Sequence, residues 1–270
     1  MSIELIGDGY AVTVNEIGLY SDNTPMIKLG EEFDPTRVHT MVLRHSSTTQ
    51  FVAAMFLVDS IYVRGGSIYT LVLPYIPGAR QDRINPTGDQ LFAARSFATM
   101  LNAKGFKKVI VLDPHSPVAP SFISRVVEYP LSEVASRVWK GYSGVIAPDK
   151  GAKDRAEIFA AALDVPIFYA SKNRDVSTGK LSGFSVDVPF GHYLVVDDIC
   201  DGGGTFMGLG EKIRESGSFA DLYVTHGIFS KGVEGLKKIY KNIYTTDSLP
   251  TEQPGVLTIP VLERMKNYND

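Results

Sequence analysis

The sequence is poor in cysteine and has no long apolar run. Cys200 is the one cysteine among 270 residues, so no disulfide can form within the chain, and this scarcity fits a reducing compartment. Residues 1–10 lack the basic segment and apolar core of a secretory signal. No apolar stretch approaches the ~20 residues that a membrane-spanning helix needs. We therefore expect a cytoplasmic protein without a membrane partner.

The chain also lacks an excess of positive charge. Its 27 Lys and Arg residues are outnumbered by 30 Asp and Glu residues, which gives a net charge of −3. Proteins that bind nucleic acid carry a basic surface, so nucleic acid is not an expected partner. An anionic substrate would have to be bound by local hydrogen-bond donors and a metal ion.

Short apolar runs alternate with segments of helical length. The runs end at proline, aspartate or threonine, and they are residues 68–73, 109–112, 143–147, 193–196 and 221–224. Continuous apolar runs indicate strands that are buried on both faces of a parallel sheet. The predicted helices between them, which complete βαβ units, are residues 89–103, 155–163 and 205–215. We expect two α/β domains with mainly parallel sheets, residues 1–141 and 142–270, with ligands at the carboxyl edges of the strands.

The most informative stretch joins the fourth apolar run to the following helix. Two acids come first, then three glycines, then the start of a predicted helix. Glycines let backbone N–H groups approach an anion, and a helix N-terminus attracts negative charge. The acids can accept hydrogen bonds from vicinal hydroxyls, as on a ribose. A plain turn is the alternative, but the combination favours a phosphoribosyl site. Its residues are Asp197, Asp198, Asp201, Gly202, Gly203, Gly204 and Thr205.

This loop resembles the PRPP loop shared by type I phosphoribosyltransferases and ribose-phosphate pyrophosphokinases. Residues 73–83, L-P-Y-I-P-G-A-R-Q-D-R, resemble the pyrophosphokinase signature P-Y-x-x-Y-A-R-Q-D-R/K, with Gly78 where an aromatic residue is usual. Phosphoribosyltransferases lack this segment, so the pyrophosphokinases are favoured. The resemblance implies two type I phosphoribosyltransferase-like α/β domains, the first on the ATP side and the second on the acceptor side. It also implies ATP contacts from Arg80 and Gln81, and a guanidinium suits polyphosphate.

Three further segments resemble motifs of the same family. Residues 113–116 resemble D-x-H-x and residues 148–156 resemble P-D-x-G-x-x-x-R-A, which implies that His115 contacts ATP and that His115 and Asp149 serve a Mg²⁺ site. Mg²⁺ keeps several waters, so few protein ligands suffice. Lys172 and Arg174 resemble a K-x-R pair at the base of a flexible catalytic loop, which implies a catalytic role. Residues 225–230 resemble T-H-G-x-F-S.

Two positions depart from the family pattern. Residues 20–24 occupy the place of F-x-[DN]-x-E, which closes over adenine from a neighbouring subunit. There Tyr20 can still stack and Asp22 fits, but Thr24 replaces the glutamate. Gly202 replaces the threonine of D-T-x-G-T, which removes a hydroxyl and bulk from the 5-phosphate pocket. A more open pocket makes ADP-ribose an alternative acceptor, as in phage-encoded relatives that rebuild NAD⁺.

The resemblance implies a diphosphotransferase that moves the β,γ-diphosphate of Mg²⁺–ATP to the anomeric hydroxyl of ribose 5-phosphate. The competing hypotheses are the same chemistry on ADP-ribose, a phosphoribosyltransferase, and a non-catalytic regulatory homologue. The chain looks like a short, phage-type member, and residues 84–89 replace the family's basic stretch. We therefore expect little regulation by phosphate or ADP, and a homo-oligomer, a dimer or larger, in place of the usual hexamer.

Overall fold

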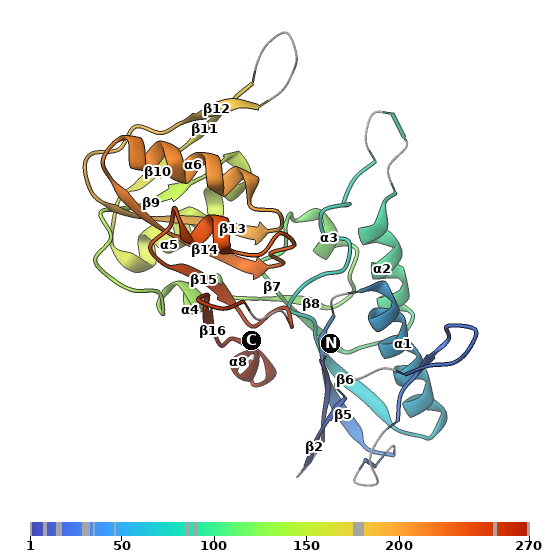
Figure 1. The fold of residues 1–270 in the computed structure, drawn as a ribbon. Helices are drawn as coiled ribbons and strands as arrows, with labels where there is room; N and C mark the ends of the chain where they lie inside the picture. The colour runs from blue at the N-terminus through green and yellow to red at the C-terminus, as the bar shows by residue number, and fades with distance from the viewer. Residues whose placement is uncertain are drawn as a thin grey trace. The chain divides into compact units, whose positions relative to one another are not determined.

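The computed structural model describes residues 2–7, 10–14, 18–28, 33–34, 36–45, 47–84, 87–88, 91–174, 181–250 and 253–268. The chain divides into two compact units (Figure 1). Unit 1 comprises Met1–Tyr129, Ser248–Pro250 and Leu262–Asp270, and unit 2 comprises Pro130–Asp247 and Thr251–Val261. This division differs from the predicted boundary after residue 141, because α4 (Leu131–Ala135) packs against α5 (Lys153–Leu163) in unit 2.

Unit 1 is built on a six-stranded sheet with the order β2-β1-β5-β6-β7-β8. β1 pairs antiparallel with β2 and β5, whereas β5, β6, β7 and β8 run parallel. The strands are β1 (Ser2–Gly7), β2 (Tyr10–Val14), β5 (Val38–Arg44), β6 (Ser67–Val72), β7 (Lys108–Leu112) and β8 (Val126–Tyr129). Parallel neighbours require crossover connections, and helices supply them here.

Helices α1 (Thr48–Val63) and α2 (Ala93–Asn102) connect the parallel strands of unit 1 and lie side by side (Figure 1). The ring of Phe51 on α1 lies 5.0 Å from that of Phe97 on α2. Residue 89, where the second helix was predicted to begin, lies outside the described residues. Shorter elements complete the unit: the hairpin β3 (Gly18–Leu19) and β4 (Pro25–Met26), α3 (Val118–Ser121) and α8 (Leu262–Lys266).

Unit 2 contains a second six-stranded sheet, of order β10-β9-β13-β14-β15-β16, in which every pair is parallel. Its strands are β9 (Gly144–Ala147), β10 (Ile167–Tyr169), β13 (His192–Cys200), β14 (Phe219–Gly227), β15 (Ile243–Thr246) and β16 (Leu257–Ile259). β13 is longer than the apolar run predicted, because its pairing with β14 continues through Asp197 to Cys200. Asp197 and Asp198 of the predicted site therefore lie within the strand.

The remaining elements of unit 2 are the 3₁₀ turn η1 (Lys150–Ala152), α6 (Gly204–Glu215), α7 (Glu234–Lys237) and the hairpin β11 (Ser171–Arg174) and β12 (Leu181–Ser185). The core of the unit includes Val195, Leu209 and Leu222, which are fully buried. The predicted α/β fold with mainly parallel sheets is confirmed. None of the helices in the described part of the chain has the length and apolar character needed to cross a membrane.

A buried polar cluster surrounds Asp221 near the amino end of β14. Asp221 is 0% exposed and accepts a hydrogen bond from the hydroxyl of Tyr142 at 2.7 Å. The Nε2 of His192 lies 3.0 Å from the same carboxylate, and the backbone and side-chain amides of Asn242 donate to it at 3.0 Å each. These partners compensate the loss of water around a buried charge.

We predict that Asp221→Ala lowers the free energy of unfolding by about 3–5 kcal/mol, because the buried groups around the carboxylate lose their acceptor. Tyr142→Phe removes one donor and one hydrogen bond, so it should cost about 1 kcal/mol. Urea denaturation of the two variants and the wild type measures both effects. A smaller loss in Asp221→Ala than in Tyr142→Phe would contradict the prediction.

Candidate active site

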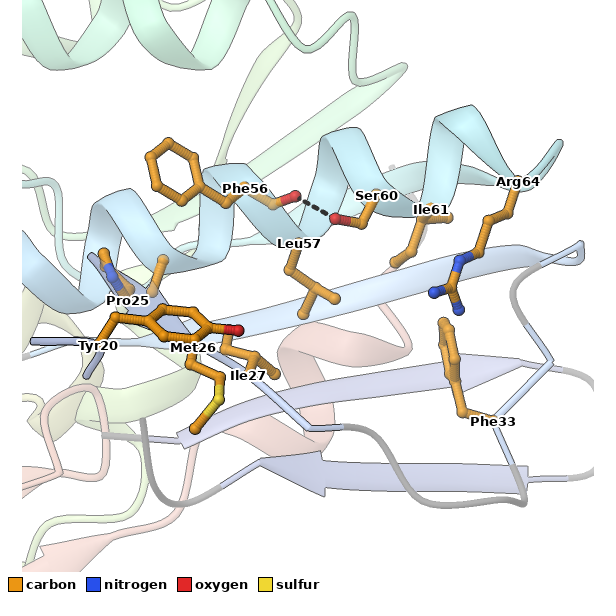
Figure 2. Close-up of a pocket in the computed structure, with 11 residues that line it drawn as sticks. Tyr20, Pro25, Met26, Ile27, Phe33, Phe56, Leu57, Ser60, Ile61 and Arg64 are labelled. Atoms are coloured by element: carbon orange, nitrogen blue, oxygen red, sulfur yellow. Dashed lines mark hydrogen bonds between the residues drawn. The ribbon is translucent and has the colours of Figure 1, made fainter. Parts of the chain in front are cut away.

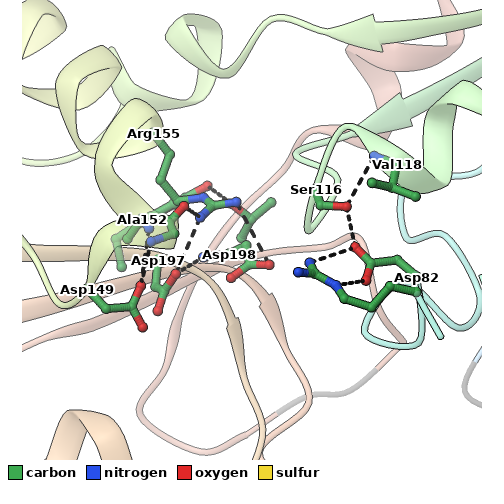
Figure 3. Close-up of polar contacts among 12 residues, drawn as sticks. Asp82, Ser116, Val118, Asp149, Ala152, Arg155, Asp197 and Asp198 are labelled. Carbon is green, nitrogen blue, oxygen red and sulfur yellow. Dashed lines mark hydrogen bonds and ion pairs between the residues drawn. The ribbon is translucent and has the colours of Figure 1, made fainter. Parts of the chain in front are cut away.

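In unit 1, the carboxylate of Asp82 joins the turn after β6 to the turn after β7 (Figure 3). Asp82 is 2% exposed, and it accepts hydrogen bonds from Arg83 Nε at 2.8 Å and from the hydroxyl of Ser116. Burial alone would raise the pKa of Asp82, but the bonds from Arg83 and Ser116 outweigh it and lower that pKa below its ordinary value. Asp82 is therefore ionised, and its hydrogen bonds connect the turn after β6 to the turn after β7.

Three residues predicted to contact ATP lie on the two turns that Asp82 connects. The side chains of Arg80, Gln81 and His115 are all exposed. The amide of Gln81 donates to the carbonyl of Gly78 at 2.8 Å, which fixes the first turn. The second turn bends at Asp113, whose φ of +38° is in the left-handed region. The structure thus brings these residues to the same edge of the unit 1 sheet, and their contact with ATP stays a prediction.

The local structure explains why residue 78 is a glycine. Its φ is +69°, which glycine adopts readily and an aromatic residue does not. A Cβ atom there would lie 2.9 Å from the Cβ of Ala93 at the start of α2. The family's usual aromatic residue would require this helix to move.

Tyr20 and Asp22 lie on the β3–β4 hairpin, which packs against α1. The amide of Thr24 donates to Asp22 at 2.9 Å, and this bond lowers the pKa of Asp22. Tyr20 is 58% exposed and borders a pocket of about 450 Å³ between the hairpin and α1 (Figure 2). Arg80, Gln81 and His115, which are also predicted to contact ATP, do not line this pocket.

In unit 2, three carboxylates gather at the carboxyl ends of β9 and β13, which are neighbours in the sheet (Figure 3). Asp149 follows β9 by two residues, and Asp197 and Asp198 lie in the last part of β13. Asp198 is 4% exposed, and the side chain of Asp197 is 14% exposed. Because parallel strands end at the same edge, the acids of two separate motifs meet at this edge.

The guanidinium of Arg155, on α5, lies against both acids of β13 (Figure 3). Its Nη1 is 3.5 Å from Asp197 Oδ1, and its Nη2 is 3.9 Å from Asp198 Oδ2. Nη1 also donates a hydrogen bond to the carbonyl of Gly151 at 2.8 Å. The Arg155 side chain is 9% exposed, so its charge is largely shielded from water and acts on the carboxylates beside it.

The pKa of Asp197 is raised well above its ordinary value. Burial is the main cause, and the neighbouring charge of Asp198 is the second. The positive charge of Arg155 opposes both effects. Arg155 therefore makes the rise in the pKa of Asp197 smaller than burial and Asp198 alone would make it.

Asp149 has a structural role that the sequence did not reveal. Its Oδ1 accepts hydrogen bonds from the amides of Gly151 and Ala152, at 2.9 Å and 3.3 Å, and so caps η1. Among the described residues no three His, Cys, Asp or Glu side chains form a metal-binding group. Mg²⁺ takes one or two carboxylates and completes its shell with water and phosphate oxygens. Asp149 and His115 belong to different units, and their roles at a Mg²⁺ site stay predictions.

The loop from Asp201 to Thr205 has the backbone form of an anion site. Gly203 has φ of +76° and is the N-cap of α6, whose first amides have no partner within the helix. The hydroxyl of Ser230 donates to Asp201 Oδ1 at 2.5 Å and holds the loop from outside. A Cβ atom on Gly204 would meet no other atom within 4 Å. Ser230 therefore holds the loop at Asp201, whereas the space around Gly204, at the other end, is empty of other side chains among the described residues.

Lys172 and Arg174 belong to β11, which pairs antiparallel with β12 (Figure 1). In this register Lys172 is opposite Phe184 and Arg174 is opposite Leu181. The side chains of both residues, and residues 175–180 altogether, lie outside what the structure describes. The catalytic role of the pair stays a prediction.

Sequence reasoning assigned no role to Arg155, Ser116 or Ser230, although each lies within a recognised motif. A signal was available for Arg155, because its neighbours on α5, Ala156 and Phe159, are apolar and fully buried. An arginine on such a helix face needs a carboxylate partner. The two serines carry no signal of this kind, because hydroxyls are common in solvent-exposed turns.

A comparison with models of known protein families finds no match. A ribose-phosphate pyrophosphokinase of Thermococcus kodakarensis is 26% identical over 273 residues, covering 97% of this chain and 95% of that protein. A ribose-phosphate pyrophosphokinase of Pyrococcus abyssi is 29% identical over 229 residues, covering 82% and 79%. The crystal structure of phosphoribosylpyrophosphate synthetase from Mycobacterium smegmatis matches with a TM-score of 0.78 at 21% identity, over 93% of this chain and 87% of that one. This last match shows a shared fold.

We predict that Arg155→Met lowers the free energy of unfolding at neutral pH by about 3–5 kcal/mol, because two buried carboxylates lose their counter-charge. Arg155→Lys keeps a positive charge and should lose less. Urea denaturation of both variants tests this. Equal stability of Arg155→Met and the wild type would show that the guanidinium is not needed.

A second prediction concerns pH. The folded-state pKa of Asp197 lies above the ordinary value of 3.8, so the folded protein binds this proton more tightly than the unfolded chain. The stability that this group contributes therefore falls as pH rises from about 3.8 towards the folded-state pKa. Asp197→Asn removes the titration, so its stability relative to the wild type should increase with pH over that range. A constant difference in denaturation midpoint across the pH series would contradict this.

Proposed function

We propose that this chain, an enzyme of the ribose-phosphate pyrophosphokinase family, transfers the β,γ-diphosphate of Mg²⁺–ATP to the 1-hydroxyl of ribose 5-phosphate, giving phosphoribosyl pyrophosphate and AMP. The names of its curated relatives support this proposal. The observation that carries it is in unit 2, where paired acids on β13 lead directly into a glycine-rich loop at the start of α6.

On the acceptor side, Asp197 and Asp198 would accept hydrogen bonds from the two vicinal ring hydroxyls of the sugar. The loop from Asp201 to Thr205 would bind the 5-phosphate through its backbone amides and the N-terminus of α6. Arg155 supports this role, because an ionised carboxylate is a better acceptor than a protonated one. The acids and the loop adjoin along the chain, so they can bind the two ends of one small sugar phosphate.

On the ATP side, Arg80 and Gln81 would bind the polyphosphate and His115 would contact the nucleotide. Adenine would stack on Tyr20, with Asp22 beside it, from a neighbouring subunit of a homo-oligomer. The 58% exposure of Tyr20 on its hairpin supports a contact outside its own chain. When bound, Mg²⁺ would neutralise phosphate charge, and His115 and Asp149 would hold it directly or through water.

The reaction is a substitution at the β-phosphorus of ATP. The 1-hydroxyl oxygen forms a bond to this phosphorus and loses its proton to water, the bond to the oxygen bridging the α- and β-phosphorus breaks, and AMP leaves with that oxygen. Phosphoryl-type transfer depends mainly on positioning and charge stabilisation. Lys172 and Arg174 would provide positive charge where negative charge accumulates during the transfer.

ADP-ribose is the alternative acceptor for the same chemistry. The observation that favours it is Gly202, which adds no side chain to the phosphate loop. Incubating the protein with Mg²⁺–ATP and each acceptor, and following AMP and product by phosphorus NMR, decides between the two. Product from neither acceptor would reject the proposal and favour a non-catalytic homologue. Use of phosphoribosyl pyrophosphate without AMP formation would favour a phosphoribosyltransferase.

We predict that Lys172→Ala combined with Arg174→Ala lowers turnover about 10³–10⁵-fold, because a cation aimed at the transferring group stabilises the transition state. The matched control is Lys212→Ala with Arg214→Ala, a pair of the same residue types and spacing in the last turn of α6. The control should keep wild-type turnover. AMP release at the wild-type rate from the first variant would reject the catalytic role.

A further inference from the structure

The segment that follows β14 is tied to the phosphate loop residue by residue. The amides of Ile228 and Phe229 both donate to the carbonyl of Cys200, at 2.9 Å each. The hydroxyl of the next residue, Ser230, donates to Asp201 at 2.5 Å. These successive hydrogen bonds place residues 228–230 alongside residues 200–201, where the loop begins.

Lys231 comes next and lies over Gly202. A Cβ atom built on Gly202 would be 3.5 Å from both Cδ and Cε of Lys231 and 3.9 Å from its Cγ. The ammonium is one bond of ~1.5 Å beyond Cε, so it lies within about 5 Å of the same point. The lysine stem is therefore in van der Waals contact with the position that a Cβ atom at residue 202 would take.

The positive charge of Lys231 is not neutralised by another residue in the described part of the chain. Among the residues that the structure describes, no carboxylate forms an ion pair with Lys231, and its side chain is exposed. The loop itself, residues 201–205, contains no basic residue. Lys231 thus adds a positive charge to a loop whose other attraction for anions comes from backbone amides and the α6 N-terminus.

We infer that Lys231 binds the terminal phosphate of the acceptor and makes the site selective for a phosphate monoester. This inference rests on the proposed function of the loop. Residue 202 is a glycine where the family signature D-T-x-G-T has a threonine, and the Lys231 stem lies beside this position. A monoester carries nearly two negative charges at neutral pH. Each phosphate of a diphosphate diester carries about one, so a point charge favours ribose 5-phosphate over ADP-ribose.

The test is calorimetric titration of the protein with ribose 5-phosphate and with ADP-ribose, without ATP, so that no turnover is required. Lys231→Met should weaken binding of ribose 5-phosphate about tenfold or more, as expected for a charged hydrogen bond, and should reduce the preference over ADP-ribose. Lys231→Arg should retain most of the affinity. Unchanged affinity in Lys231→Met, or no binding of ribose 5-phosphate by the wild type, overturns the inference.

Lys241→Met is the matched control. The amide of Lys241 donates to the carbonyl of Ala220 near the amino end of β14, at the opposite edge of the sheet, and its side chain is exposed. The affinity of the Lys241→Met variant for ribose 5-phosphate should equal that of the wild type. The two proposals fail separately: a wild type that binds sugar phosphate through Lys231 but forms no AMP rejects only the proposed reaction. AMP formation with unchanged binding in Lys231→Met rejects only the inference.

Discussion

The buried guanidinium of Arg155 is the contact on which the unit 2 site depends. β13 carries two adjacent acids directly after Val195 and Val196, which are fully buried, and like charges in such surroundings repel strongly. Arg155 offsets this repulsion at 3.5 Å and 3.9 Å from the two acids, and the same guanidinium bonds the carbonyl of Gly151 in η1. One side chain thus fixes the acids of β13 and the turn that Asp149 caps.

Each unit uses a buried charge to join turns at the carboxyl edge of a parallel sheet. In unit 1 the charge is negative, on Asp82, and its partners come from the two motif turns. In unit 2 it is positive, on Arg155, and its partners are acids. In unit 1, exposed residues such as Arg80 and His115 lie on the turns that Asp82 connects. The buried contacts of Asp82 therefore support the groups proposed to bind substrate.

The sequence predicted the fold class and five of the twelve strands in the two main sheets, because runs such as residues 109–112 are apolar throughout and end at a proline or an acid. It could not predict that β13 continues through Asp197, because a charged residue inside a strand is tolerated only when a distant partner such as Arg155 is present. Composition likewise gives no sign that α4 packs against α5 in unit 2. Long-range pairings of this kind leave no local pattern.

Unit 1 is discontinuous in the sequence: the chain leaves it after Tyr129, returns at Ser248–Pro250, and returns again with its last segment at Leu262. That segment is anchored beside β1: Lys266 Nζ lies 2.6 Å from Glu4, and the ring of Tyr268 lies 5.2 Å from that of Tyr129. Strand β1 and helix α8, which lie on either side of unit 2 in the sequence, are therefore held together by contacts within unit 1.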